Sequence, residues 1–81
     1  MDKREVIVRS GEIKLDSFLK LAGVVSTGGQ AKFFLENGQV KVNGQPEERR
    51  GRKLKVNDEV TIDELGSFIV VSSKNNLGGE K

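Results

Sequence analysis

Histidine, cysteine, tryptophan and tyrosine are all absent from this chain of 81 residues. Without thiols or imidazoles it has no cysteine nucleophile, no disulfide, no histidine base and none of the usual ligands of transition metals. A chain of this length forms one small domain, with little core in which to build an active-site cavity. We therefore expect a protein that is not an enzyme and that uses no metal, no cofactor and no small-molecule substrate.

Long apolar runs are also missing. The charged N-terminal stretch, residues 1–5, leads into only three apolar residues, which predicts neither a signal peptide nor a membrane span. A cytoplasmic location without a membrane partner is the resulting expectation, and the chain is expected to act as a monomer.

The net charge is only +2, but the charged residues are unevenly distributed. Residues 57–81 contain five acidic and two basic residues, whereas residues 39–56 contain six basic and two acidic ones. Such segregation gives a folded domain a positive face despite a small total charge. The basic residues of this stretch are Lys41, Arg49, Arg50, Arg52, Lys53 and Lys55.

The segment VVSTGGQAKFF, residues 24–34, has the glycines and the lysine of a phosphate-binding loop. In a P-loop the lysine directly follows a glycine and directly precedes a hydroxyl residue that binds Mg²⁺. Lys32 instead follows Ala31 and precedes Phe33. So short a chain also lacks room for the parallel sheet and crossover helices of a nucleotide-binding fold. A nucleotide site is therefore not expected.

The same segment contains the start of a helix. Thr27 followed three residues later by Gln30 is the pattern of a capping box, in which each side chain binds a backbone N–H group. Gly28 and Gly29 then fall in the first turn, where free N–H groups can contact an anion. The glycines thus predict one backbone contact to a phosphate rather than a nucleotide pocket.

The spacing of apolar residues predicts two helices connected by this capped segment. The second helix starts at the cap and ends at Asn37-Gly38, residues that tolerate a left-handed conformation. The first helix ends at Gly23 and has an apolar stripe with helical spacing. The stripe consists of Leu15, Phe18, Leu19 and Ala22.

Alternating apolar residues around the helices predict strands at residues 5–9, 40–42, 60–62 and 68–72. Asn43-Gly44 predicts a tight hairpin turn, and Pro46 confines the returning strand to the edge of a sheet. We expect a single α+β domain over residues 1–73 and a disordered tail over residues 74–81.

This order of elements resembles the S-four (S4) domain, an RNA-binding module. The resemblance covers about residues 13–62 and depends on the stretch KLDSFLKLAGVVSTGGQAKFFLENGQVKVNG. The stretch STGGQAKFFLENGQVKVNGQPEERRGRKL is similar to small stand-alone bacterial members, which the family links to structured RNA and ribosome maturation. The resemblance implies a two-helix alpha-L motif packed on a small, mostly antiparallel sheet.

The resemblance also implies a non-catalytic protein that binds structured RNA, with ribosomal RNA or a pre-ribosomal particle as the expected partner. Relatives often carry an arginine where this chain has Gly28, so a backbone contact or the Arg49–Lys53 cluster is expected to replace it. Arg50 and Arg52 are expected to be exposed. The implied RNA-binding residues are Lys14, Lys20, Thr27, Gly28, Gly29, Gln30, Lys32, Lys41, Arg49, Arg50, Arg52 and Lys53.

The aromatic residues argue against a protein that reads single strands. Of the four phenylalanines, Phe18, Phe34 and Phe68 are patterned for the core. Phe33 lies off the helical stripe and could stack a base, but it is expected instead to pack against a strand. No stacking platform for bases is therefore predicted. Recognition should involve the shape and the phosphates of the RNA backbone, with weak dependence on sequence.

Two other functions are consistent with parts of the sequence. A protein-binding adapter could use the edge strand near Pro46. A sulfur carrier would act through Gly78-Gly79, but such proteins end at the second glycine, whereas Glu80 and Lys81 follow here. The sulfur-carrier reading therefore requires proteolytic processing and is strongly disfavoured.

Overall fold

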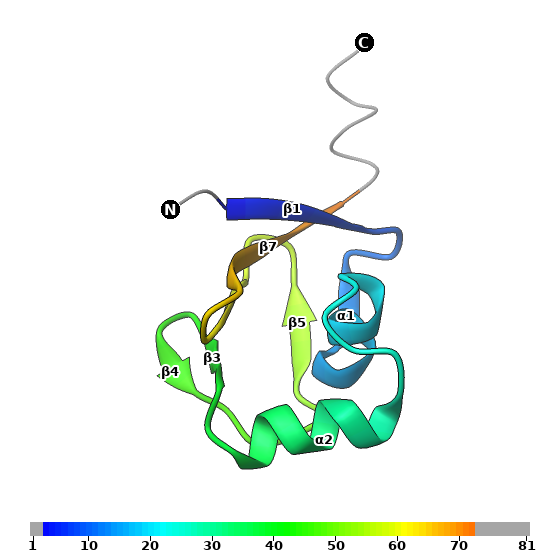
Figure 1. The fold of residues 1–81 in the computed structure, drawn as a ribbon. Helices are drawn as coiled ribbons and strands as arrows, with labels where there is room; N and C mark the ends of the chain where they lie inside the picture. The colour runs from blue at the N-terminus through cyan, green and yellow to red at the C-terminus, as the bar shows by residue number, and fades with distance from the viewer. Residues whose placement is uncertain (1–2, 73–81) are drawn as a thin grey trace, which may run out of the picture.

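The computed structural model describes residues 3–72 and shows an α+β fold, which confirms the predicted class (Figure 1). The tail predicted at residues 74–81, with its two glycines, lies outside the described residues. Within the described part, the elements are β1 (Lys3–Val8), β2 (Glu12–Lys14), α1 (Leu15–Leu21), α2 (Gly28–Glu36), β3 (Val40–Val42), β4 (Gln45–Pro46), β5 (Lys53–Lys55), β6 (Glu59–Ile62) and β7 (Gly66–Ser72).

The main sheet has the strand order β1-β7-β6-β3-β4. β1 runs parallel to β7 and the other neighbours are antiparallel, so the sheet is mostly antiparallel, as predicted. Pro46 in β4 lies on an edge strand, where its missing N–H group breaks no ladder. Asn43 and Gly44 form the predicted hairpin turn with φ angles of 53° and 85°.

A second, two-stranded sheet consists of β2 and β5, which pair antiparallel. We call it the β2–β5 ribbon. Its register places Ile13 opposite Leu54 and Lys14 opposite Lys53. Leu54 is buried and Ile13 packs against the core, so alternation along each strand turns the two lysines toward solvent. The three residues of β2 alternate too briefly to be recognised as a strand from the sequence.

Both helices pack their apolar residues onto the core that the sheets share. α1 buries Leu15, Phe18 and Leu19, and α2 buries Ala31 and Leu35. In Figure 1, α2 crosses the bottom of the molecule, α1 stands beside β5, and β1 and β7 lie at the top. In residues 3–72, neither helix has the length and apolar character that crossing a membrane requires.

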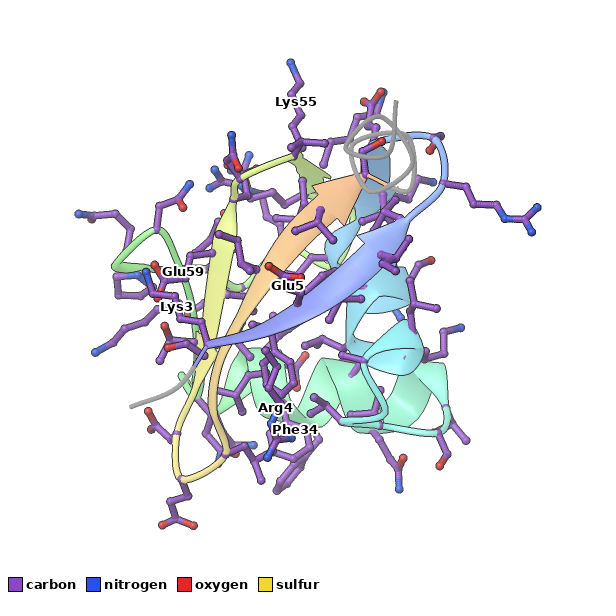
Figure 2. All side chains as sticks on the ribbon, turned by 90° about the horizontal axis from the view of Figure 1, so that it is seen from above. Lys3, Arg4, Glu5, Phe34, Lys55 and Glu59 are labelled. Atoms are coloured by element: carbon purple, nitrogen blue, oxygen red, sulfur yellow. The ribbon has the colours of Figure 1, made fainter. Side chains whose placement is uncertain are left out.

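Two cations of β1 contact side chains of β6 and β7. Lys3 Nζ lies 3.3 Å from Glu59 Oε1 (Figure 2). The Arg4 guanidinium lies 5.5 Å from the centroid of the Phe68 ring. These two cations are therefore engaged within the domain. Most of the predicted RNA-binding cations lie on other elements, namely on the two helices and in residues 49–53, which we call the basic segment.

Candidate nucleic-acid interface

α2 begins with the capping box that the sequence predicts. The N–H group of Gln30 donates to Thr27 Oγ1 at 3.2 Å, and Gln30 Oε1 accepts from the N–H group of Ser26 at 2.6 Å. The return bond thus reaches one residue before the cap. The two bonds fix the direction in which the chain enters α2, and with it the direction of the first-turn N–H groups.

The first turn of α2 is open to a ligand. The first N–H groups of any helix have no acceptor within the helix, and the helix dipole makes them attractive to anions. A Cβ atom built at Gly28 would meet nothing within 4 Å, so an anion can approach this backbone closely. Thr27, Gly28, Gly29 and Gln30, all predicted from the sequence, are therefore brought together at one end of α2.

Replacing Thr27 with alanine should lower the free energy of unfolding by about 1 kcal/mol, because the N–H group of Gln30 loses its acceptor. Thr27→Ser keeps that acceptor and should unfold like the wild type. Urea denaturation of the three proteins measures the difference. Unchanged stability of Thr27→Ala together with lost RNA binding would show that Thr27 acts as a ligand and not as a cap.

α1 is capped by the backbone of the basic segment, not by a side chain. Lys14 occupies the cap position and makes no side-chain capping bond. The N–H group of Leu15 donates to the carbonyl of Arg52 at 2.8 Å, and that of Asp16 donates to the carbonyl of Arg50 at 3.0 Å. These bonds hold the basic segment against the start of α1, next to Lys14.

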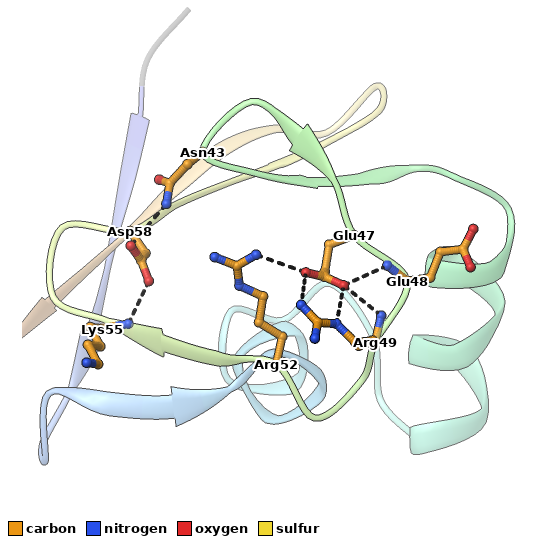
Figure 3. A network of polar contacts seen from close by, with 7 residues as sticks. All are labelled: Asn43, Glu47, Glu48, Arg49, Arg52, Lys55 and Asp58. Carbon is orange, nitrogen blue, oxygen red and sulfur yellow. Dashed lines mark hydrogen bonds and ion pairs between the residues drawn. The ribbon is translucent and has the colours of Figure 1, made fainter.

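Glu47 is the buried charged residue of the described chain, with 7% of its surface exposed. Its Oε2 accepts from the N–H groups of Glu48 and Arg49, at 3.1 and 3.0 Å, and from Arg49 Nε at 3.1 Å. Its Oε1 accepts from Arg49 Nη2 at 3.3 Å and from Arg52 Nη1 at 2.9 Å (Figure 3). We call Glu47, Arg49 and Arg52 the Glu47 clamp.

The clamp keeps Glu47 ionised. Hydrogen bonds from the side chains of Arg49 and Arg52, and from the backbone of Arg49, lower the pKa of the Glu47 carboxyl from 4.5 to about 2. The side-chain hydrogen bond between Arg49 and Glu47 also raises the pKa of the Arg49 guanidinium. Glu47 was not predicted as a functional residue from the sequence. The one local indication of its role is that the pair Glu47-Glu48 directly precedes the arginines of this stretch.

The clamp changes what the predicted arginines can do. The Arg52 side chain is only 31% exposed, so the expectation of a solvated Arg52 is wrong: its guanidinium turns inward to the buried carboxylate. Arg49 keeps 76% of its side chain exposed although it binds Glu47. Arg50 is exposed, as expected, and in residues 3–72 it has no ion pair.

The other predicted cations fall into two groups. Lys53 pairs with Glu12 at 3.7 Å and Lys32 with Glu36 at 3.9 Å, and such exposed pairs are weak enough to be exchanged for a phosphate. The second group consists of exposed lysines without an ion pair in the described part of the chain, namely Lys14, Lys20 and Lys41.

The structure brings most of these cations to one region. Lys14 and Lys53 are opposite one another in the β2–β5 ribbon, and the basic segment caps the helix that follows Lys14. We call Lys14, Arg49, Arg50, Arg52 and Lys53 the basic surface. Lys20 lies in the last turn of α1, about 9 Å farther along the helix axis, and α1 contacts α2, which carries Lys32.

Lys41 lies on β3, opposite Pro46, which directly precedes Glu47. It is exposed between Val40 and Val42, which are buried, so its side chain points away from the core on the outer face of the main sheet. In residues 3–72 no hydrogen bond or ion pair connects it to the basic surface. That Lys41 binds RNA stays a prediction from the sequence, and a comparison of Lys41→Ala with Lys14→Ala tests it.

Phe33 is not where the sequence places it. It was expected to pack against a strand, but 61% of its surface is exposed, so that expectation is wrong. Its ring meets the ring of Phe34 edge-on, with centroids 6.1 Å apart and planes at 80°. Phe34 is half-buried against the core, and Phe18 and Phe68 are buried, as predicted.

Asp58 connects two turns of the domain through its carboxylate. Asp58 accepts from the N–H group of Lys55 at 2.8 Å and from Asn43 Nδ2 at 3.1 Å, which ties the turn before β6 to the β3–β4 hairpin (Figure 3). Among residues 3–72, no three acidic side chains lie close enough together to hold a metal ion. The polar contacts of this region are hydrogen bonds from N–H groups to the carboxylates of Glu47 and Asp58.

Comparison with known proteins gives three matches. The family model described as the S4 domain matches residues 6–71. The chain is 55% identical over 60 residues to "Probable ribosome maturation protein RlbA" of Bacillus subtilis (strain 168), which covers 74% of this chain and 84% of that protein. It is 37% identical over 65 residues to "Small ribosomal subunit protein uS4m" of Schizosaccharomyces pombe, which covers 80% of this chain but 20% of that protein.

Proposed function

Because the chain belongs to the S4 domain family, we propose that it binds structured RNA, specifically ribosomal RNA or an assembling ribosomal particle, without catalysing a reaction. The names of the two relatives support the ribosomal partner, since one is called a ribosome maturation protein and the other a ribosomal subunit protein. The observation that carries the proposal is the backbone capping of α1 by the basic segment, which gathers the cations on one surface.

In this proposal the cations have two roles. Lys14, Lys20 and Arg50 are exposed and unpaired within residues 3–72, so they are free to contact phosphates. Arg52 turns inward to Glu47 and fixes the segment, so its role is to hold the surface in shape. Arg49 does both, because its guanidinium binds Glu47 while most of its side chain faces solvent.

The open turn of α2 adds one more phosphate contact through the N–H groups of Gly28 and Gly29. All these contacts are to the RNA backbone. Phosphate contacts fix the position of a protein on RNA but do not identify bases, so binding should depend strongly on salt and on RNA shape.

Arg50→Ala and Arg52→Ala should separate the two roles. Arg50→Ala should weaken binding to RNA, while its free energy of unfolding changes by less than about 0.5 kcal/mol because the side chain is exposed. Arg52→Ala removes the 2.9 Å bond to buried Glu47 and should lower the free energy of unfolding by about 1 to 2 kcal/mol. Urea denaturation and RNA titration of both variants give the comparison. Equal stability of the two variants would contradict the assignment.

Crosslinking in cells followed by sequencing of the attached RNA tests the proposed partner. We expect ribosomal RNA to be enriched over its share of total RNA, with the reads gathered at a few structured sites. The matched control is the Arg50→Ala protein, which should recover less of the same RNA. Recovery of proteins that is unaffected by nuclease, with no enriched RNA, would instead favour the adapter that uses the edge strand at Pro46.

A further inference from the structure

Phe33 combines large exposure with a position on the helix that carries the open turn. Its exposed fraction, 61%, exceeds those of the other exposed large apolar residues, Ile7, Leu21 and Leu65. A single exposed apolar side chain is common on protein surfaces and means little alone. The neighbours of Phe33 decide what such a ring can bind.

The neighbours of Phe33 are suited to a nucleotide. Residues three and four apart share one face of a helix, so Gly29, Lys32, Phe33 and Glu36 lie together on the solvent side of α2. Gly29 is one turn, about 5.4 Å, from Phe33. Lys32 is held only by the weak exposed pair with Glu36. An aromatic ring therefore lies beside an available cation and close to an anion-attracting turn.

The ring of Phe33 has one aromatic neighbour within the domain. It meets Phe34 edge-on with planes at 80°, and Phe34 is itself packed against the core, which favours this orientation of the exposed ring. A side chain that is already ordered loses less conformational freedom when it forms a contact.

We propose that Phe33 stacks on an unpaired base of the RNA while Lys32 contacts the phosphate of that nucleotide. A nucleotide offers a flat base and a negative phosphate together, which matches the ring and the cation on this face. This inference rests on the proposed RNA-binding function and adds a requirement on the kind of RNA that is bound. The RNA must present an unpaired nucleotide, in a loop or a bulge, beside the structured part that the basic surface contacts.

Phe33→Leu and Phe33→Trp test the stacking. Leucine keeps an apolar side chain but has no aromatic face, whereas tryptophan keeps a stacking face. The probes are a stem–loop RNA and a blunt-ended duplex with the same stem. We expect Phe33→Leu to bind the stem–loop roughly five-fold or more weakly than the wild type does, and to bind the duplex with unchanged affinity. Phe33→Trp should bind the stem–loop like the wild type.

Three results would overturn base stacking, and a fourth would contradict the proposed function on which it rests. Phe33→Leu that binds the stem–loop like the wild type would show that the ring does not contact the RNA. Equal weakening for stem–loop and duplex, or a Trp variant as weak as the Leu variant, would exclude base stacking. A wild-type protein that binds neither RNA would contradict the proposed function itself. The three preceding results leave RNA binding by the wild type intact, so the two kinds of failure are distinguishable.

Discussion

Replacing Glu47 with alanine should lower the free energy of unfolding by about 2 to 4 kcal/mol, the largest stability loss expected from any charged residue here. The change leaves the N–H groups of Glu48 and Arg49 without their acceptor and removes the partner of Arg52. Glu48→Ala is the matched control, since Glu48 is exposed and in residues 3–72 its carboxylate binds no partner. Urea denaturation of both variants makes the comparison. Similar losses in the two would contradict the clamp.

The clamp also makes stability depend on pH in acid. The pKa of Glu47 is about 2 in the folded protein and 4.5 without its partners, so the unfolded chain binds the proton more readily. Its contribution is complete above about pH 5 and is lost as the pH falls toward 2. We expect about 2 to 3 kcal/mol of the unfolding free energy to depend on this carboxylate. Glu47→Gln should show a shallower loss between pH 5 and pH 2, and an unchanged slope would contradict the clamp.

The second large effect is expected on RNA binding. Replacing Lys14, Lys20 and Arg50 together with alanine removes three exposed cations that have no ion pair in the described part of the chain. If each contacts a phosphate, affinity for a ribosomal RNA fragment should fall roughly 100-fold near 0.1 M salt. Thermal unfolding should change little, because exposed side chains away from structural contacts contribute little to stability.

Lys41 provides the control for this loss. Lys41→Ala removes the same charge as Lys14→Ala, but from the outer face of the main sheet. If the basic surface is the main contact region, Lys14→Ala should weaken RNA binding more than Lys41→Ala does. If both single variants weakened binding equally, the cations would act through net charge alone, and the basic surface would have no special role.

Features set by neighbouring residues were predicted well from the sequence. The capping box at Thr27 needs only Gln30 three residues later. The bond to Thr27 is present, and the Gln30 side chain reaches back to the N–H group of Ser26, one residue before the cap. The hairpin at Asn43-Gly44 depends on two residues that accept positive φ, and the structure has them there. Pro46 lies on an edge strand because its ring removes the donor that an interior strand needs.

Features that depend on contacts between distant segments were missed. The start of α1 is capped by carbonyl groups of residues 50 and 52, and no local pattern announces such a partner. The pairing of β2 with β5 was missed for the same reason, because the two strands are far apart in the sequence. Glu47 looked like an ordinary charge in a basic stretch, and only folding buries it between two arginines. The prediction that Phe33 packs against a strand was wrong, because the exposure of Phe33 depends on which face of α2 packs against the core.

The most direct test of RNA binding by the basic surface and the neighbouring Lys20 is the salt dependence of affinity for a ribosomal RNA fragment. It is measured for the wild type and for the triple alanine variant of Lys14, Lys20 and Arg50. Each phosphate contact contributes roughly 0.7 to 0.9 to the slope of log affinity against log salt. We expect a steep negative slope for the wild type and a slope shallower by roughly 2 to 3 for the variant. A flat slope for the wild type, or the same slope for both proteins, would contradict RNA binding through this surface.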